Sequence, residues 1–88
     1  MAAPTITAVT VRYFAAARAA AGVETEQVDL PAGASVEILL KVLRSSDDAL
    51  ARVLDRCSFL VDEVAVRDRQ AHLRDGAVVD VLPPFAGG

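Results

Sequence analysis

The sequence is poor in the residues that build metal centres, disulfides and nucleophilic active sites. Its 88 residues include one cysteine, Cys57, and one histidine, His72. A single cysteine excludes an internal disulfide and leaves no cysteine cluster for a metal ion. A chain of this length forms one domain with one modest core, so a deep cleft holding several catalytic side chains is not expected.

Long apolar runs and an excess of basic residues are lacking as well. The net charge is −3, with acids and bases interspersed, whereas nucleic-acid binders usually show a basic face. No apolar run approaches the ~18 residues that cross a bilayer. Residues 1–5 have neither a basic start nor an apolar signal core. The sequence therefore predicts a cytoplasmic protein with no nucleic-acid partner and no membrane partner.

Apolar patterns predict strands at both ends of the chain. Residues 6–14 are rich in β-branched and aromatic residues, and residues 24–30 alternate polar with apolar side chains. These two segments are expected to pair as an antiparallel hairpin. Residues 77–82 are apolar nearly throughout, which is typical of a central strand. The following Pro83-Pro84 stops that strand, because proline cannot donate to a strand ladder.

Helical signals occupy the middle of the chain. The alanine-rich segment 15–21 is closed by a glycine and predicts a short helix. Ser35 is a plausible N-cap for a second helix. A further helix is expected to start at residues 46–48, with apolar residues at helical spacing as far as Cys57. The second helix has an apolar stripe that should pack on the sheet, formed by Val36, Leu39, Leu40 and Leu43.

A short buried strand is predicted between these helices and the last strand. It covers residues 58–61 and is followed by the acidic pair Asp62-Glu63, which we interpret as a turn. Residues 64–66 either extend this strand or form its hairpin partner. The complete order predicts an α+β fold, with a mixed sheet of four to five strands and helices packed on one face.

The six residues after the last predicted strand, 83–88, form a distinctive end. Two prolines hold the backbone extended, and six extended residues reach about 20 Å, far enough to enter a partner's cleft. Two final glycines lack Cβ atoms, so the backbone can pass a narrow channel. Tail composition alone leaves open whether this end is functional or simply frayed, although the aromatic Phe85 favours function.

Three side chains elsewhere could carry chemistry, and each has a simpler interpretation. Arg18 could contact a carboxylate or a partner surface, or it could keep an alanine-rich helix soluble. Cys57 is expected to be a small buried hydrophobe, because a sulfur-transfer thiol needs exposure and a lowered pKa. His72 adjoins a turn without a nucleophile pattern around it, which favours a solvent-facing imidazole.

Three segments together resemble the small-subunit family of molybdopterin synthase, which belongs to the ubiquitin-like β-grasp sulfur carriers. Residues 11–22 are similar to the family's opening strand, its F-A-x-x-R pattern and the glycine that follows. Residues 73–79 are similar to its L-x-D-G turn into the last strand, and residues 83–88 to its P-P-x-x-G-G end. Thiamine-pathway carriers usually lack the double proline. Phe85 stands where the family has a smaller residue, which bears on the fit to a partner.

The resemblance implies a β-grasp domain over residues 1–82 and an extended tail over residues 83–88. An E1-like enzyme is expected to adenylate the Gly88 carboxylate with ATP, and a sulfurtransferase or desulfurase to supply the sulfur of a thiocarboxylate. Gly88, together with Gly87, would then deliver sulfur to the large subunit of molybdopterin synthase for dithiolene formation. The chain would be a non-catalytic subunit that holds no metal or cofactor, with acid–base groups on the partner.

Partner contacts are expected in the tail and on the exposed sheet face. Phe14 is a candidate there, although it could equally belong to the core. A ubiquitin-like modifier, a carrier for thiamine, cysteine or tRNA thiolation, and an interaction module with an inert tail remain alternative functions. The residues expected to contact a partner are Pro83, Pro84, Phe85, Ala86, Phe14 and Arg18.

Overall fold

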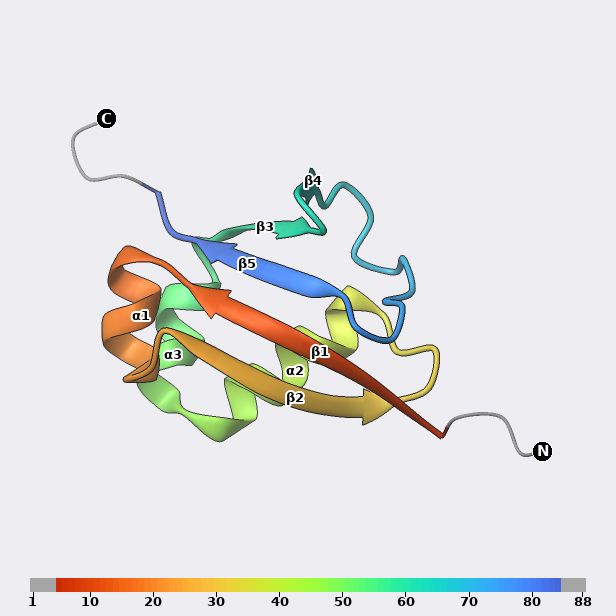
Figure 1. Ribbon diagram of the computed structural model, residues 1–88. Coiled ribbons are helices and arrows are strands. Elements are labelled where there is room, and N and C mark those ends of the chain that lie inside the picture. The colour runs from red at the N-terminus through yellow and green to blue at the C-terminus, as the bar shows by residue number, and fades with distance from the viewer. Residues whose placement is uncertain (1–4, 85–88) are drawn as a thin grey trace.

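A mixed sheet of five strands, covered on one side by three helices, forms the protein (Figure 1). The computed structural model describes residues 5–84. The strand order across the sheet is β2-β1-β5-β3-β4. The predicted α+β class and mixed sheet are thus confirmed. The elements in chain order are β1 (Ile6–Tyr13), α1 (Ala15–Ala21), β2 (Thr25–Pro31), α2 (Val36–Ser46), α3 (Asp48–Leu54), β3 (Ser58–Val61), β4 (Val64–Ala65) and β5 (Val78–Leu82).

The last strand, β5, lies in the middle of the sheet, as its apolar composition predicts. It pairs parallel with β1 and antiparallel with β3, while β1 and β2 form the expected antiparallel hairpin. Val79 and Val81 on β5 are completely buried. Burying two β-branched side chains in the centre of the sheet contributes roughly 1.5–3 kcal/mol each, so the C-terminal strand is firmly held.

Side chains alternate between the two faces of the sheet. On β1 the inward residues, such as Val9 and Val11, are buried under the helices, while the residues between them are only partly covered. We call the side away from the helices the open face; Figure 1 shows it without a covering layer. By strand register its central positions are Thr10, Arg12, Leu60, Val78, Asp80 and Leu82.

The helices start where the sequence predicts, and only the last of them, α3, ends earlier than predicted. The Ser35 hydroxyl accepts a hydrogen bond from the Ile38 N–H at 3.3 Å, which confirms it as the N-cap of α2. Asp47 caps α3 by accepting from the N–H of Ala49 at 2.8 Å. Because α3 ends at Leu54, the helical spacing that extends to Cys57 is misleading, and this cysteine lies between α3 and β3.

The acidic pair between β3 and β4 forms a two-residue hairpin turn. Val61 pairs with Val64 across it, so residues 64–65 return as a hairpin partner of β3. Asp62 has φ of 48° and Glu63 has φ of 70°, a left-handed conformation that side chains other than glycine, asparagine and aspartate rarely adopt. Asp62 also accepts a hydrogen bond from the Val78 N–H at 3.0 Å, so its carboxylate ties the turn to β5.

Replacing Glu63 by glycine should therefore stabilise the protein. Glycine relieves the strain of the left-handed conformation, which stabilises the folded state. Its greater freedom in the unfolded chain offsets part of this gain. The net increase in the free energy of unfolding should be about 0.5–1 kcal/mol. Urea or thermal unfolding measures it. Glu63→Ala is the matched control, since it removes the same carboxylate but keeps the Cβ atom. Equal shifts for the two variants would show that the charge, and not the backbone, is responsible.

Candidate functional site at the tail exit

The tail leaves the protein from the end of the central strand. β5 ends at Leu82, Pro83 is partly buried and Pro84 is exposed. In Figure 1 this exit lies at the end of the sheet beside α1. The remaining tail positions to which the sequence assigns a role, Phe85, Ala86, Gly87 and Gly88, lie outside the described residues, and their roles stay predictions. Pro83 and Pro84 therefore mark where the described structure ends and the tail begins.

A hollow of about 350 Å³ lies at the base of the tail. Its lining includes Ala16 on α1, Val53 on α3 and the two prolines. Two exposed arginines form its polar side, Arg52 on α3 and Arg56 just after the end of α3. Within residues 5–84 neither of these arginines forms an ion pair. The tail thus begins next to apolar side chains and two positive charges, although the net charge of the whole protein is −3.

Phe14 and Arg18 lie at the same end of the sheet as the tail. Phe14 is 41% exposed, so the open question of whether it belongs to the core is settled in favour of the surface. Its N–H donates to the Val81 carbonyl oxygen at 3.2 Å, which fixes it one residue from the end of β5. The exposed Arg18 lies 3.7 Å from the Glu24 carboxylate. Both side chains line one hollow of about 280 Å³, so these two predicted contact residues are brought together.

An ion pair on the open face, between the partly exposed Arg12 and the buried Asp80, was not anticipated from the sequence. Arg12 donates from Nε to Asp80 Oδ1 at 2.5 Å and from Nη2 to Oδ2 at 2.8 Å. The two hydrogen bonds and the negative charge of Asp80 raise the pKa of Arg12 above its ordinary value. Asp80 is the one acidic residue in the apolar run of β5, and this interruption is the signal by which the pair could have been found.

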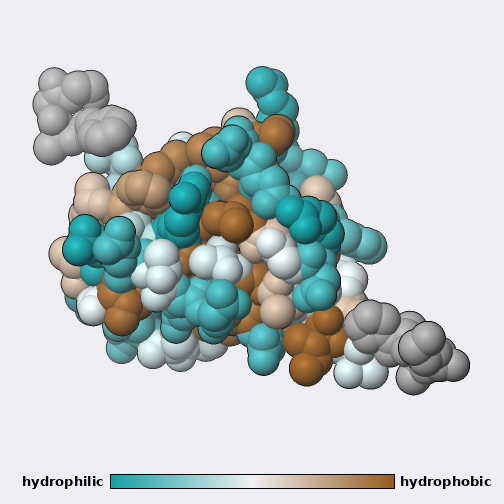
Figure 2. All heavy atoms as spheres, in the orientation of Figure 1, coloured by the Kyte–Doolittle hydropathy of each residue, from teal (hydrophilic) through white to brown (hydrophobic). Residues whose placement is uncertain are grey.

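The open face carries apolar side chains that are partly exposed. Figure 2 views this face and shows apolar spheres from the middle of the sheet toward the tail exit, interrupted by hydrophilic ones. Leu60, Val78 and Leu82 occupy outward positions there and are only partly covered. An apolar surface next to the point where the tail begins is suited to docking a protein partner.

Cys57 and His72 have the simpler roles expected of them. Cys57 is 8% exposed, and burial raises the pKa of its thiol. The Cys57 Sγ lies 3.2 Å from the Val53 carbonyl oxygen and donates to it. His72 is exposed. A neutral buried thiol cannot serve as the nucleophile of a sulfur transfer.

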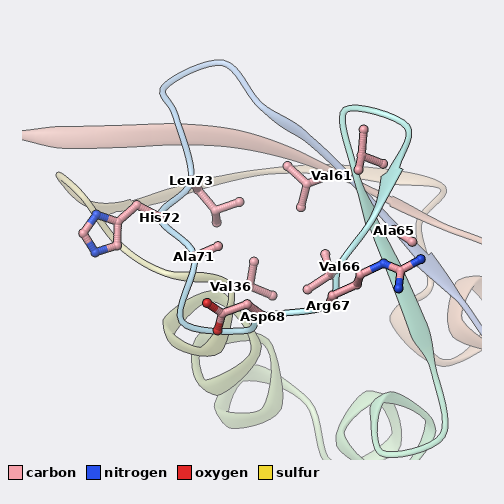
Figure 3. Close-up of a pocket in the computed structure, with 10 residues that line it drawn as sticks. Val36, Val61, Ala65, Val66, Arg67, Asp68, Ala71, His72 and Leu73 are labelled. Carbon is pink, nitrogen blue, oxygen red and sulfur yellow. The ribbon is translucent and has the colours of Figure 1, made fainter.

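A second hollow, of about 190 Å³, lies away from the tail. Figure 3 shows Val36, Val61, Val66 and Leu73 pointing toward one another beneath the loop after β4, with the His72 ring turned away. Val61 pairs with Val79 near the start of β5, so this hollow lies at the opposite end of the strand from the tail exit. It takes no part in a site built on the tail.

The described part of the chain carries neither a cluster of metal ligands nor a membrane-spanning helix. Over residues 5–84 there is no group of three or more histidine, cysteine, aspartate or glutamate side chains arranged to hold a metal ion. None of the helices in these residues has the length and apolar character needed to span a membrane.

Replacement of Cys57 by alanine tests its structural role. The raised pKa means that the folded state binds the thiol proton more tightly than the unfolded state, so stability should fall as the pH rises above about 8.5, the ordinary thiol value. In Cys57→Ala the fall in stability that the thiol causes at alkaline pH should be absent. Unfolding curves between neutral and alkaline pH provide the measurement, together with slow alkylation of the wild-type thiol at neutral pH. Rapid alkylation of the folded wild type would contradict burial.

Comparison with known proteins points to one family. Residues 11–88 match the ThiS family. A molybdopterin synthase sulfur carrier subunit from Chlamydomonas reinhardtii is 39% identical over 80 residues, which are 89% of this chain and 95% of that protein. Among solved structures, a putative molybdopterin converting factor subunit 1 from Pyrococcus furiosus has a TM-score of 0.82 at 31% identity, covering 90% of this chain and 99% of that one.

A complex of subunits 1 and 2 of the molybdopterin-converting factor from Helicobacter pylori also contains a chain of this fold. Its TM-score is 0.68 at 24% identity, with 93% of this chain and 100% of that one covered. At this identity the likeness concerns the fold alone. These neighbours confirm the ubiquitin-like β-grasp architecture that the sequence predicts.

Proposed function

This chain belongs to the ThiS family, and on that basis we propose that it is the sulfur-carrier subunit of a molybdopterin synthase. The observation that carries the proposal is the 39% identity to a carrier subunit over nearly the whole of both chains. The central position of β5 supports it, because a strand paired on both sides gives a firm root to the Pro-Pro-x-x-Gly-Gly tail.

The proposed chemistry takes place at the carboxylate of Gly88. A carboxylate is a poor electrophile, so an E1-like enzyme would first transfer AMP from ATP to it and release pyrophosphate. A persulfide on the sulfurtransferase or desulfurase would then attack the acyl carbon, and AMP would leave with its bonding electrons. A second thiol would attack the donor's sulfur in the acyl disulfide so formed, becoming a disulfide with the donor and releasing the thiocarboxylate. The resulting thiocarboxylate is nucleophilic near neutral pH and would be delivered to the large synthase subunit for dithiolene formation.

The surroundings of the tail exit agree with a carrier that performs no catalysis. Cys57 is buried, and among the described residues no other cysteine could relay sulfur. The side chains nearest the exit are arginines, small apolar residues and prolines. General acids and bases would then be supplied by the activating enzyme and by the large subunit.

Loading of sulfur onto Gly88 is the direct test. Incubation with the cognate E1-like enzyme, ATP and a sulfur donor should exchange one oxygen for one sulfur in the intact mass of the wild type. Deletion of Gly88 should abolish the exchange while leaving the unfolding curve unchanged, because the core ends with β5. Intact mass spectrometry provides the readout. An unchanged mass with a proven cognate enzyme would overturn the carrier function.

The chemical form of Gly88 in cell extract distinguishes a carrier from a ubiquitin-like modifier. A modifier would be found in cell extract joined through Gly88 to lysine side chains of other proteins. A carrier would be found mainly as free thiocarboxylate. Abundant lysine conjugates would favour the modifier, and retention of function after deletion of Gly88 would favour an interaction module with an inert tail.

Docking of the large subunit through the open face predicts a role for Phe14. Its ring is exposed beside the tail exit, so Phe14→Ala should weaken binding by about 2 kcal/mol, a typical cost for an aromatic anchor. Ile38→Ala is the matched control, because Ile38 has similar exposure, 39%, but lies on helix α2. Calorimetry with the large subunit measures both, and equal losses would contradict docking at the open face.

A further inference from the structure

Asp80 is buried on the open face of the sheet, which no helix of residues 5–84 covers. It occupies the middle of β5 in an outward position, between Arg12 of β1 and Leu60 of β3 in the strand register. Its side chain is 7% exposed, although carboxylates on an open sheet face are normally hydrated. Because water is largely excluded, the acid depends on Arg12 for compensation of its charge.

Arg12 compensates Asp80 with only part of its hydrogen-bonding capacity. A guanidinium has five N–H donors, and the fork to Asp80 uses the Nε donor and one on Nη2. Both Nη1 donors and the second Nη2 donor make no hydrogen bond within residues 5–84. The Arg12 side chain is 43% exposed, and its guanidinium carbon lies 6.0 Å from the centre of the Phe14 ring. The arginine is thus fixed by its acid and still presents donors at the surface.

The charges around the pair indicate which acceptor fits. A hollow of about 300 Å³ beside it is lined by Arg12, Val78, Asp62 and Glu63. Asp62 is paired with Arg74 at 3.1 Å, whereas Glu63 has no ion pair within the described residues. The negative charge of Glu63 also acts on Arg12. A second carboxylate placed here would meet this negative charge, so an uncharged oxygen, such as a peptide or amide carbonyl, is the better complement.

We propose that the Arg12–Asp80 pair makes the open face selective, by requiring the docking protein to present a carbonyl oxygen to Arg12. A purely apolar partner surface would bury the remaining guanidinium donors. These donors would lose their hydrogen bonds to water and gain none from the partner, which is unfavourable. A partner with the carbonyl in place gains a charge-assisted hydrogen bond at the centre of the contact. The inference rests on the proposed docking of the large synthase subunit through this face.

A purely structural role for the pair makes the opposite prediction. An ion pair can often be replaced by apolar residues of similar volume without loss of stability. If the pair only joins β1 to β5, such a replacement would leave the open face more apolar and docking unchanged or tighter. If the pair selects the partner, the same replacement leaves the partner's carbonyl oxygen buried without a donor, and docking weakens.

The double variant Arg12→Met with Asp80→Leu distinguishes the two roles. We expect its unfolding midpoint to match that of the wild type, and its affinity for the cognate large subunit to fall about tenfold or more, the range for one unpaired polar group. Arg12→Lys is the second variant, since lysine preserves the charge opposite Asp80 but lacks the planar fork. It should fold normally and also bind more weakly.

The control is an ion pair on the opposite side of the protein. Glu37→Leu with Arg44→Met removes the 4.0 Å pair on α2, together with the 3.3 Å contact between Arg44 and Asp55, and should leave affinity unchanged. Affinities of both Arg12 variants within about threefold of wild type would overturn the selectivity, while leaving the sulfur carrier intact. A wild-type chain that accepts sulfur at Gly88 but does not bind the large subunit would overturn the docking on which the inference rests.

Discussion

The parallel pairing of β1 with β5 is the contact on which the rest of the structure depends. It places the first and last strands side by side in the centre of the sheet, with Val11 opposite Val79 and Tyr13 opposite Val81. These four side chains are almost completely buried under the helices. A parallel pair cannot be closed by a short turn, so everything between these strands serves as their connection. The tail root therefore cannot move without opening the core.

This arrangement gives the end of β5 a fixed position in the domain. The described residues contain a packed core, in which even the thiol of Cys57 is buried and its pKa raised. For a carrier this is an advantage, because a reactive side chain near the tail would compete for the activated carboxylate. Under the proposed function, partner recognition is assigned to the surfaces around the exit, where Phe14 and Arg18 line one hollow.

Local patterns in the sequence predict most of the fold, because helix caps and turns are determined by interactions between residues that are close in the chain. The cap at Ser35 and the turn at Asp62-Glu63 depend on neighbours in the chain, although the left-handed conformation of that turn was not predicted. The end of α3 was mispredicted, because apolar spacing through Cys57 reports burial, and a residue in a loop can be buried as well as one in a helix. The Arg12–Asp80 pair joins residues 68 positions apart, and only the register of a parallel pairing brings them together. Predicting it requires knowing the topology first.

The residues of the open face can change independently of those in the core. The inward positions of β1 and β5 must stay apolar, since they fill the core shared with the helices. The outward positions carry no such restriction, and a polar pair can be exchanged there as a unit if both partners change together. Two proteins could thus share this fold, its core and its tail chemistry, and still dock on different large subunits. Under the proposed function, the tail determines the chemistry of the carrier, and the outward residues around Asp80 determine which large subunit it binds.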